Sequence, residues 1–404
     1  MRPATRILPF LCAALLLGSC MSPTDPDTPR IRITDPTRYF LRTYDFGPVD
    51  HGYDIVQLED GGFIVVGAAY VKDKASQDVI LLRLDAEGNQ LWVKNYGGVW
   101  KDIGHSVSPT QDGGYILTGE TESYTNGRTD LWLIKTDGEG AMQWSKHFGY
   151  KDYDSGEQVL ELRAGGYMVV GYCDVPTSAG SSLWVIRTDE LGNLIWEKTL
   201  GDSERDLGSS IVETADGDII VAGSTELQGN GSSALWLLKM AVAGGDSLIW
   251  ERVLDGTNSK SCSEMLQGED GSIALIGHMF DIVTRKSNML FVKSDETGDM
   301  ITERKLHEDA IASSFEQTAD GGYIVCGYND PWPEDITSVI LLKLDANGNT
   351  LWKNVINISL HDRAQAVINT SDGGYILAGS TFSPGDAEHD LLIIKTDQSG
   401  SYEE

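Results

Sequence analysis

The sequence predicts an all-β fold, a seven-bladed β-propeller with four antiparallel strands in each blade. Three observations support this prediction. A glycine turn motif recurs seven times at nearly constant spacing. Each copy contains four short strand-like segments separated by polar turns. The last copy stops before its fourth strand, and a matching segment stands ahead of the first copy. Four-stranded repeats of about 50 residues are typical of propeller blades.

The turn motif is Asp-Gly-Gly or a degenerate form of it, and successive copies begin 52, 52, 52, 54, 50 and 52 residues apart. A basic residue follows 23 residues after the first position of every copy, and an aspartate stands two residues beyond it except where Lys239 precedes Ala241. Because all copies stay in register, residues 39–404 are expected to form one domain. The copies are Asp60-Gly61-Gly62, Asp112-Gly113-Gly114, Ala164-Gly165-Gly166, Asp216-Gly217-Asp218, Asp270-Gly271-Ser272, Asp320-Gly321-Gly322 and Asp372-Gly373-Gly374.

In the first copy, strands are expected over residues 53–58, 63–70, 79–84 and 90–96. The third segment is continuously apolar, as in a strand that is covered on both faces. Glycine in each turn supplies a positive φ, and aspartate caps nearby amides.

The N-terminal segment 39–46 (YFLRTYDF) is expected to close the ring. It lies one repeat ahead of the first fourth strand, so that Phe40 aligns with Trp92 and Tyr44 with Tyr96. A solenoid would need capping repeats, whereas a ring needs its first segment to complete its last blade. Closure also removes exposed sheet edges.

The charge balance excludes some partners. Lys and Arg total 31 against 61 Asp and Glu, which gives a net charge of −30. Such a surface repels phosphate backbones and anionic lipid, so no nucleic-acid partner is expected. With 41% hydrophobic and 23% charged residues, most of the chain should be folded, and a monomeric propeller is expected.

The first 19 residues have the form of a signal peptide. Arg2 and Arg6 precede an apolar run over 7–17 that is too short to span a bilayer. The run ends in Leu17-Gly18-Ser19-Cys20, which resembles the bacterial lipobox and implies lipidation of Cys20. An ordinary secretory signal with a chance cysteine is the alternative.

Residues 20–38 contain four prolines and are expected to form an extended tether, so the lipid would be the only membrane contact. Met21 after the cysteine favours the bacterial outer membrane. Whether the protein faces the periplasm or the cell surface stays open.

The segment from Lys343 to Trp352 resembles the repeats of bacterial propeller lipoproteins and secreted propellers, most of which lack an assigned function. It is also similar to the quinoprotein-type repeat and to the Asp-box, although Gly348 and Trp352 are one residue further apart than in the Asp-box. The quinoprotein resemblance implies a quinone cofactor. The large quinoprotein alcohol dehydrogenases, however, have eight blades and a disulfide of adjacent cysteines, which this chain lacks, so no cofactor is predicted.

Residues that the repeat does not require are the candidates for a ligand site. Eight of the ten tryptophans occupy repeated strand positions and are expected to pack, whereas Trp100 and Trp332 do not. Trp332 stands among prolines and is expected to plug a loop. The variable loops all lie on one face, and exposed aromatics beside acids suit a glycan or an envelope protein. The predicted ligand site on blades 2 and 3 comprises Trp100, Tyr124, Tyr150 and Tyr153 with Asp102 and Asp154. Simple covering of loop backbone is the alternative.

One repeated acid has two interpretations. It stands two residues before a glycine in four blades, and Asp362 matches it. The set forms either an acidic collar that attracts a cation such as Ca²⁺ or a set of turn caps, and turn capping is the favoured interpretation. No metal site is therefore predicted. The five residues are Asp50, Asp102, Asp154, Asp206 and Asp362.

Motifs of known catalytic chemistry are absent from the sequence: there is no HExxH, GxSxG or GxxxxGK[ST]. Cys173, Cys262 and Cys326 are expected to be buried apolar residues. A binding or scaffolding propeller for a glycan or protein is thus the predicted function. An enzyme acting on polysaccharide, or less plausibly a quinone-dependent dehydrogenase, is the alternative.

Overall fold

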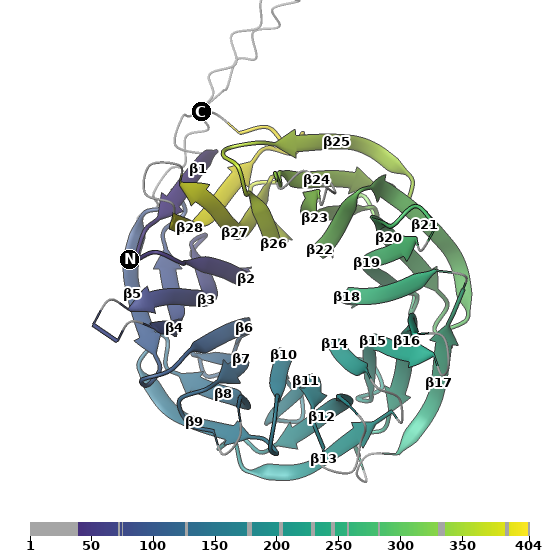
Figure 1. The fold of residues 1–404 in the computed structure, drawn as a ribbon, viewed down its shortest axis with the longest axis horizontal. Coiled ribbons are helices and arrows are strands. Elements are labelled where there is room, and N and C mark those ends of the chain that lie inside the picture. Colours follow the sequence, from purple (N-terminus) through teal and green to yellow (C-terminus); the bar gives the residue numbers. More distant parts are fainter. Residues whose placement is uncertain are drawn as a thin grey trace, which may run out of the picture. The chain divides into compact units, whose positions relative to one another are not determined.

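The structure is a computed structural model that describes residues 39–402 except for 72, 75, 126–127, 176–179, 202–204, 228–230, 244–246, 257, 282, 330–335 and 384–387. These residues form seven four-stranded antiparallel sheets arranged in a ring (Figure 1). The predicted seven-bladed propeller is confirmed. The predicted signal peptide, Cys20, the tether and Trp332 lie outside the described residues.

Blades 1 to 6 each run from the innermost to the outermost strand in chain order, whereas the outermost strand of blade 7 is the N-terminal strand of the chain. Blade 1 contains β2 (His51–Gln57), β3 (Phe63–Val71), β4 (Ser76–Leu84) and β5 (Gln90–Tyr96). Blade 2 contains β6 (Asp102–Pro109), β7 (Tyr115–Thr121), β8 (Asp130–Thr136) and β9 (Met142–Phe148). Blade 3 contains β10 (Ser155–Glu161), β11 (Tyr167–Cys173), β12 (Ser182–Thr188) and β13 (Leu194–Leu200).

Blade 4 contains β14 (Asp206–Glu213), β15 (Ile219–Leu227), β16 (Ser232–Met240) and β17 (Leu248–Leu254). Blade 5 contains β18 (Ser259–Gln267), β19 (Ile273–Asp281), β20 (Lys286–Ser294) and β21 (Met300–Glu308). Blade 6 contains β22 (Ala310–Gln317), β23 (Tyr323–Asn329), β24 (Val339–Leu344) and β25 (Thr350–Ile356). Blade 7 contains β26 (Arg363–Asn369), β27 (Tyr375–Ser383), β28 (Glu388–Thr396) and β1 (Phe40–Tyr44).

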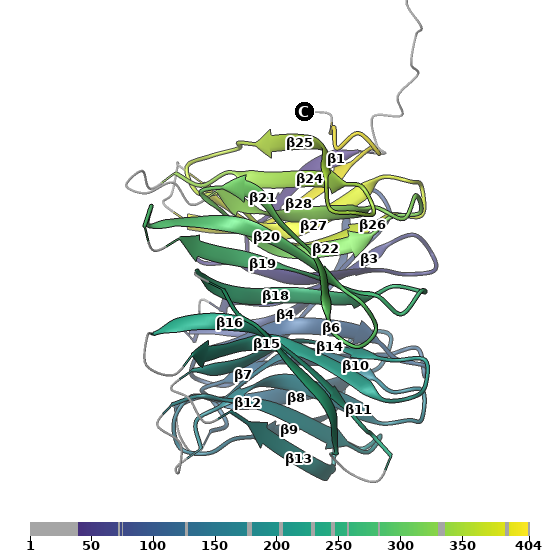
Figure 2. The same cartoon turned by 90° about the vertical axis from the view of Figure 1, so that its right-hand side faces the viewer.

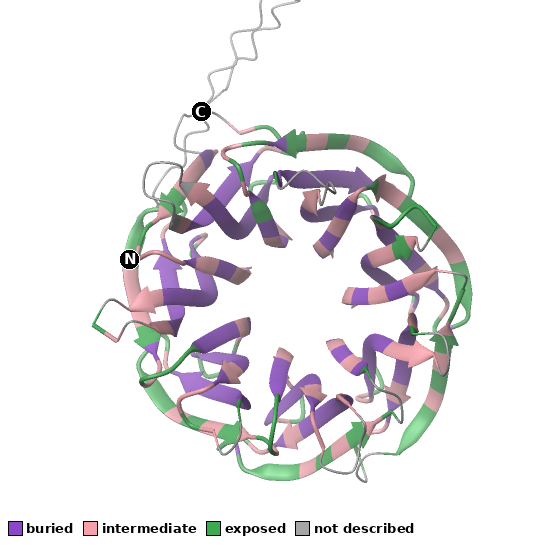
Figure 3. Cartoon of the chain, viewed as in Figure 1, coloured by how far each residue is buried: buried purple, intermediate pink, exposed green. Residues whose placement is uncertain are grey.

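The core lies between neighbouring blades. The two middle strands of each blade are mostly buried, and the outermost strands are mostly exposed (Figure 3). Figure 2 shows the same ring edge-on. We call the side that carries the Asp-Gly-Gly turns the turn face and the opposite side, where one blade connects to the next, the loop face.

The N-terminal strand closes the ring as predicted. Strand β1 pairs antiparallel with β28, in a register from Phe40 opposite Lys395 to Tyr44 opposite Leu391. The Tyr44 hydroxyl donates to the Gly88 carbonyl at 2.5 Å, and the Tyr96 hydroxyl donates to the Gly140 carbonyl at 2.6 Å. The predicted equivalence of the two tyrosines is therefore confirmed by an identical contact one blade apart.

The fourth-strand tryptophans pack on the turns of the following blade. Gly140 has a φ of +72°, and a Cβ at this position would lie 2.9 Å from the Trp92 ring. Blade 5 has Thr302 at the tryptophan position, and there Phe291 from β20 approaches Gly348 of the next turn instead. The third-strand residues Trp132 and Trp184 are buried, as predicted.

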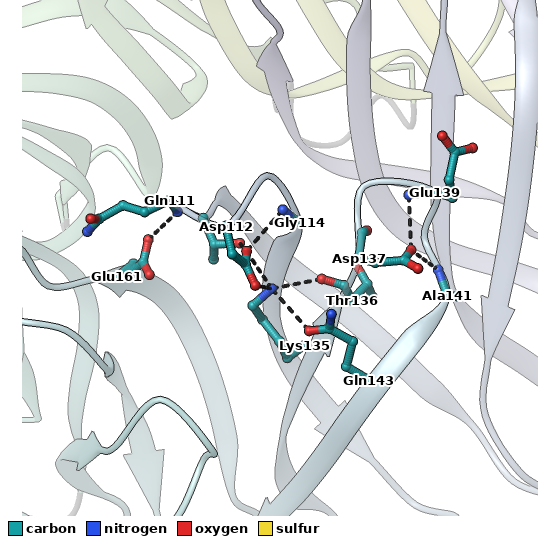
Figure 4. A network of polar contacts seen from close by, with 11 residues as sticks. Gln111, Asp112, Gly114, Lys135, Thr136, Asp137, Glu139, Ala141, Gln143 and Glu161 are labelled. Atoms are coloured by element: carbon teal, nitrogen blue, oxygen red, sulfur yellow. Dashed lines mark hydrogen bonds and ion pairs between the residues drawn. The ribbon is translucent and has the colours of Figure 1, made fainter.

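The 23-residue spacing in the repeat corresponds to an ion pair on the turn face (Figure 4). The Lys135 ammonium lies 2.9 Å from both oxygens of Asp112 and donates to the Thr136 carbonyl at 2.8 Å. Hydrogen bonds from Thr318 and Lys343 lower the pKa of Asp320 to about 2. Equivalent pairs join Asp60 to Arg83, Asp216 to Lys239 and Asp372 to Lys395.

Two further sequence features have a structural counterpart. Cys173, Cys262 and Cys326 are buried and carry free thiols, as predicted. None of the described residues forms a helix with the length and hydropathy that crossing a bilayer would require.

Candidate functional site

A β-bulge occurs at the same position in all seven innermost strands. In blade 1 the register with β3 shifts between Gly52 and Asp54, so Tyr53 is the extra residue. A bulge redirects the side chain of its extra residue. In every blade this residue lines a cavity of about 120 Å³ at the centre of the ring, which we call the central cavity. The seven extra residues are Tyr53, His105, Glu157, Ser209, Ser263, Ser313 and Gln365.

In five of the seven blades, the residue after the bulge accepts a hydrogen bond from a backbone amide of the next blade. Asp54 Oδ2 accepts from the Val107 amide of blade 2 at 2.9 Å, and Gln158 Oε1 accepts from the Ile211 amide of blade 4 at 2.7 Å. Ala366 cannot form such a bond, and the Ile55 amide of blade 1 donates instead to Asp54 Oδ1 at 2.8 Å. Three more bonds of this kind run from Met265 to Ser210, from Phe315 to Glu264 and from Val367 to Ser314. These side chains hold the blades together.

Two acids of the central cavity bind protons more readily than usual. Burial raises the pKa of Asp54 to about 6. Burial, with a smaller effect of the Asp54 and Glu316 charges, raises the pKa of Glu264 to about 8. Glu264 is therefore mainly protonated at neutral pH.

Four rings form a continuous arc beside the cavity, across blades 7, 1 and 2. The His389 and His51 centroids are 5.7 Å apart, His51 and Tyr53 are 5.9 Å apart, and Tyr53 meets His105 edge-on at 5.6 Å. We call these four residues the aromatic arc. Tyr53 and His105 line the central cavity, and His51 and His389 extend this row of rings to the third strand of blade 7.

His105 has a defined hydrogen-bond partner at the end of the arc. Its Nδ1 lies 3.2 Å from the Gly156 carbonyl oxygen, which can only accept a hydrogen bond. Nδ1 therefore carries a hydrogen and donates it to this carbonyl. Glu157 Oε1 lies 3.6 Å from Nδ1 and accepts from the Ser155 hydroxyl at 3.0 Å.

Burial keeps three residues of the arc uncharged at neutral pH. Burial and the charge of Glu120 raise the pKa of Tyr53 to about 12, so its hydroxyl stays a donor. Burial, together with the charges of His389 and Arg363, lowers the pKa of His51 to about 4. Burial also lowers the pKa of His389. These three residues therefore offer neutral rings and polar ring atoms to a ligand.

A second cavity adjoins the first between blades 4 and 5. Its volume is about 400 Å³, and Ser209 lines both cavities. Its polar lining includes Arg205, Glu226, His278 and five serines. Hydroxyl groups and a guanidinium therefore extend the polar surface outward from the ring centre.

The aromatic residues predicted from the sequence form two groups. Trp100 is 63% exposed, and its amide donates to the Ser123 hydroxyl at 3.0 Å, next to Tyr124. Tyr124 packs on Trp132 at 5.3 Å. This group belongs to blade 2 and its entrance connection.

The second group lies on the connection to blade 3. Tyr150 packs on Trp184 at 5.7 Å. Tyr153 is 46% exposed, and the Arg128 guanidinium donates to its hydroxyl at 2.5 Å. The ring contacts of each group stay within that group, and both groups lie on the loop face.

The repeated acids cap backbone amides. Asp50 accepts from the amides of Phe46, Gly47 and Tyr70 at 2.6 to 2.9 Å. Asp102, Asp154, Asp206 and Asp362 are likewise buried and accept from nearby amides or hydroxyls. These contacts are those of turn caps, and none of the five acids lines the central cavity.

Blade 5 has Lys260 at this position, and its ammonium pairs with Glu303 at 2.6 Å. Within the described part of the chain, no three His, Cys, Asp or Glu residues are placed to hold a metal ion.

The aromatic arc was not predicted from the sequence, although a pattern marks two of its residues, Tyr53 and His105. Three residues after each capping position, the repeat varies between Tyr, His, Glu, Ser and Gln, while the position before it is always a small residue. A variable position inside a repeated strand marks residues that blade construction does not require.

Comparisons with known proteins find similar folds among solved structures. No protein-family description matches the sequence, and no curated protein matches it. Polysaccharide lyase Uly1 is similar in structure, with 11% identity and a TM-score of 0.51 over 86% of this chain and 90% of its own. A protein of unknown function from Bacteroides caccae has 11% identity and a TM-score of 0.42 over 79% of this chain and 98% of its own. An alpha-L-arabinanase from Penicillium chrysogenum has 11% identity and a TM-score of 0.47 over 72% and 92%.

At this identity the likeness shows the fold alone. The structural neighbours include glycan-active enzymes and a protein of unknown function. The fold and the site together define a β-propeller with a polar central cavity and an aromatic arc.

Proposed function

We propose that this protein is a lipid-anchored extracytoplasmic binding module that holds a glycan on its loop face. The aromatic arc is the observation that supports this most strongly, because a run of neutral rings beside a hydroxyl-rich cavity suits a sugar. Sugar rings stack on aromatic faces, and their hydroxyls need donors and acceptors together. An envelope protein that inserts a polar side chain is the alternative partner.

The size of the central cavity limits what can enter it. A volume of about 120 Å³ corresponds to roughly four water molecules. One small ring or one side chain would fit, and the remainder of a longer ligand would extend over the loop face. Trp100, Tyr124 and Tyr153 would then contact more distant parts of the same ligand.

The proposed anchor is the diacylglycerol on Cys20, with residues 20–38 as the tether. A Cys20→Ala variant should fail to be processed or should be released from outer membranes, as judged by fractionation and mass spectrometry. An unmodified mature N-terminus at another residue would contradict the anchor.

The proposed binding is tested with an array of plant, algal and bacterial glycans probed with the folded domain. We expect a restricted set of positive glycans whose signal is lost in Tyr53→Ala and kept in Leu351→Ala. Leu351 is a suitable control because it is 59% exposed on the outermost strand β25. Equal signals from all three proteins would contradict a glycan site at the arc.

A polysaccharide-active enzyme is the second candidate, and the position of His105 favours it. An imidazole in ring contact with Tyr53 and 3.6 Å from the Glu157 carboxylate belongs to a group of residues that can transfer protons. Incubation of bound polysaccharides with the protein separates the two functions. Shortening of the polymer that disappears in His105→Ala would support the enzyme, whereas binding without shortening supports the binding module.

A further inference from the structure

A cationic group lies beside the aromatic arc in this otherwise acidic protein. Arg363, at the start of β26, is exposed, and its guanidinium stacks on the Tyr328 ring of blade 6 at 4.8 Å. Among the described residues Arg363 has no carboxylate partner, whereas Lys135, Lys239 and Lys343 all pair with aspartate. A positive charge that is oriented by stacking but left without a counter-ion is available to a ligand.

Residues near Arg363 connect it to the aromatic arc and to the central cavity. His361, two residues before Arg363, contacts the His389 ring at a centroid distance of 6.4 Å, and Gln365, two residues after it, lines the central cavity. His389 Nδ1 is buried and has no hydrogen-bond partner in the part of the chain that the structure describes.

The opposite side of the arc is acidic. Glu157 lines the central cavity, and its Oε1 lies 3.6 Å from His105 Nδ1 at the other end of the arc. Carboxylates accept hydrogen bonds from sugar hydroxyls, whereas a guanidinium binds oxyanions through two parallel N–H groups. The arc thus has one end suited to hydroxyl groups and one end suited to an anion.

We infer that Arg363, with His389, binds the anionic group of a carboxylated or sulfated sugar whose ring rests on the aromatic arc. This inference rests on the proposed glycan binding and specifies the class of glycan. The net charge of −30 opposes polyanions at long range, but this repulsion is screened beyond about 8 Å at physiological salt. Recognition of one anionic group at close range is therefore compatible with the acidic surface.

The test uses matched pairs of oligosaccharides in calorimetric titrations. Oligogalacturonate is compared with its methyl ester, and a sulfated galactan oligosaccharide with its desulfated form. We expect at least one acidic form to bind at least tenfold more tightly than its neutral partner. The pair that shows this preference identifies the anion as carboxylate or sulfate.

Arg363→Gln should abolish the preference while leaving binding of the neutral form unchanged. Arg304→Gln on the outermost strand β21 is the matched control and should keep the preference, since Arg304 is exposed far from the cavity lining. Melting temperatures of both variants establish that they are folded. Equal binding of acidic and neutral forms by the wild-type protein would overturn the inference and leave the proposed function intact. Absence of binding to all four oligosaccharides and to every glycan of the array would overturn both.

Discussion

Single residues beside the bulges determine how the blades are joined around the central cavity. Gln158 accepts from the Ile211 amide at 2.7 Å and from the Ser210 hydroxyl at 2.9 Å. Gln365 occupies the bulge of blade 7 and lines the cavity without a bond of this kind. Both glutamines line the cavity, but only Gln158 also forms hydrogen bonds to the next blade.

Gln158→Ala should leave the Ile211 amide without its acceptor and lower the free energy of unfolding by about 1–3 kcal/mol. Gln365→Ala should change it by less than about 0.5 kcal/mol. Urea denaturation of both variants measures the difference. Equal losses would show that the bridging bonds do not stabilise the ring.

Some acids of the folded protein have raised pKa values and others have lowered ones. Together they should make the free energy of unfolding largest in mildly acidic solution. Glu264 has a pKa of about 8 in the folded protein, so it holds its proton more tightly there than in the unfolded chain. Its contribution to the free energy of unfolding is therefore lost as the pH rises from the usual pKa of glutamate toward 8. Asp216 and Asp320, with a pKa of about 2, stabilise the fold above their usual pKa and lose this contribution as pH falls toward 2.

We therefore expect the free energy of unfolding to fall on both sides of a maximum near pH 4 to 5. Glu264→Gln keeps an acceptor for the Phe315 amide and cannot ionise. It should flatten the decline between about pH 5 and 8, as measured by urea denaturation across the pH series. An unchanged slope would mean that Glu264 titrates normally.

At the scale of the strands and loops, repetition made the fold predictable. Seven copies of one turn fixed the blade number, and the alignment of Phe40 with Trp92 located the closing strand. The arc could not be predicted in this way, because a bulge is defined only by the register of two paired strands. His389 of blade 7 also meets His51 of blade 1 only when the ring closes. The contacts of Tyr124 with Trp132 and of Tyr150 with Trp184 are equally invisible in the sequence.

The closing strand β1 can be tested by truncation. Deleting residues 20–47 removes the outermost strand of blade 7 and exposes β28, so cooperative thermal unfolding should be lost or shifted to a much lower temperature. Deleting residues 20–38 alone removes no described strand and is the control. A truncated protein that melts like the control would contradict closure by β1.

The aromatic loops of blades 2 and 3 make a separate prediction. If Trp100 and Tyr153 extend the glycan surface, replacing both by Ala should weaken binding by roughly tenfold, because each stacking contact contributes on the order of 1 kcal/mol. The melting temperature should barely change, since both side chains are largely exposed. Lower stability with unchanged binding would show that they only pack the loops.

At the scale of the whole molecule, the two faces of the ring carry different structural features. The turn face is occupied by capped turns and ion pairs, whereas the loop face carries the variable connections and exposed aromatic residues. Strand β1 enters the ring from the turn face, since it takes the place of a fourth strand. The N-terminal end of β1 therefore lies on the turn face, opposite the loop face that carries the exposed aromatic residues.

The central claim is that the aromatic arc binds the glycan, and Tyr53 tests it most directly. Calorimetric titration with a glycan that the array identifies should show at least about tenfold weaker binding by Tyr53→Ala. Tyr53→Phe, which keeps the ring, should retain most of the affinity, and Leu351→Ala should bind like the wild type. If folded Tyr53→Ala binds the glycan with unchanged affinity, the arc is not the binding site.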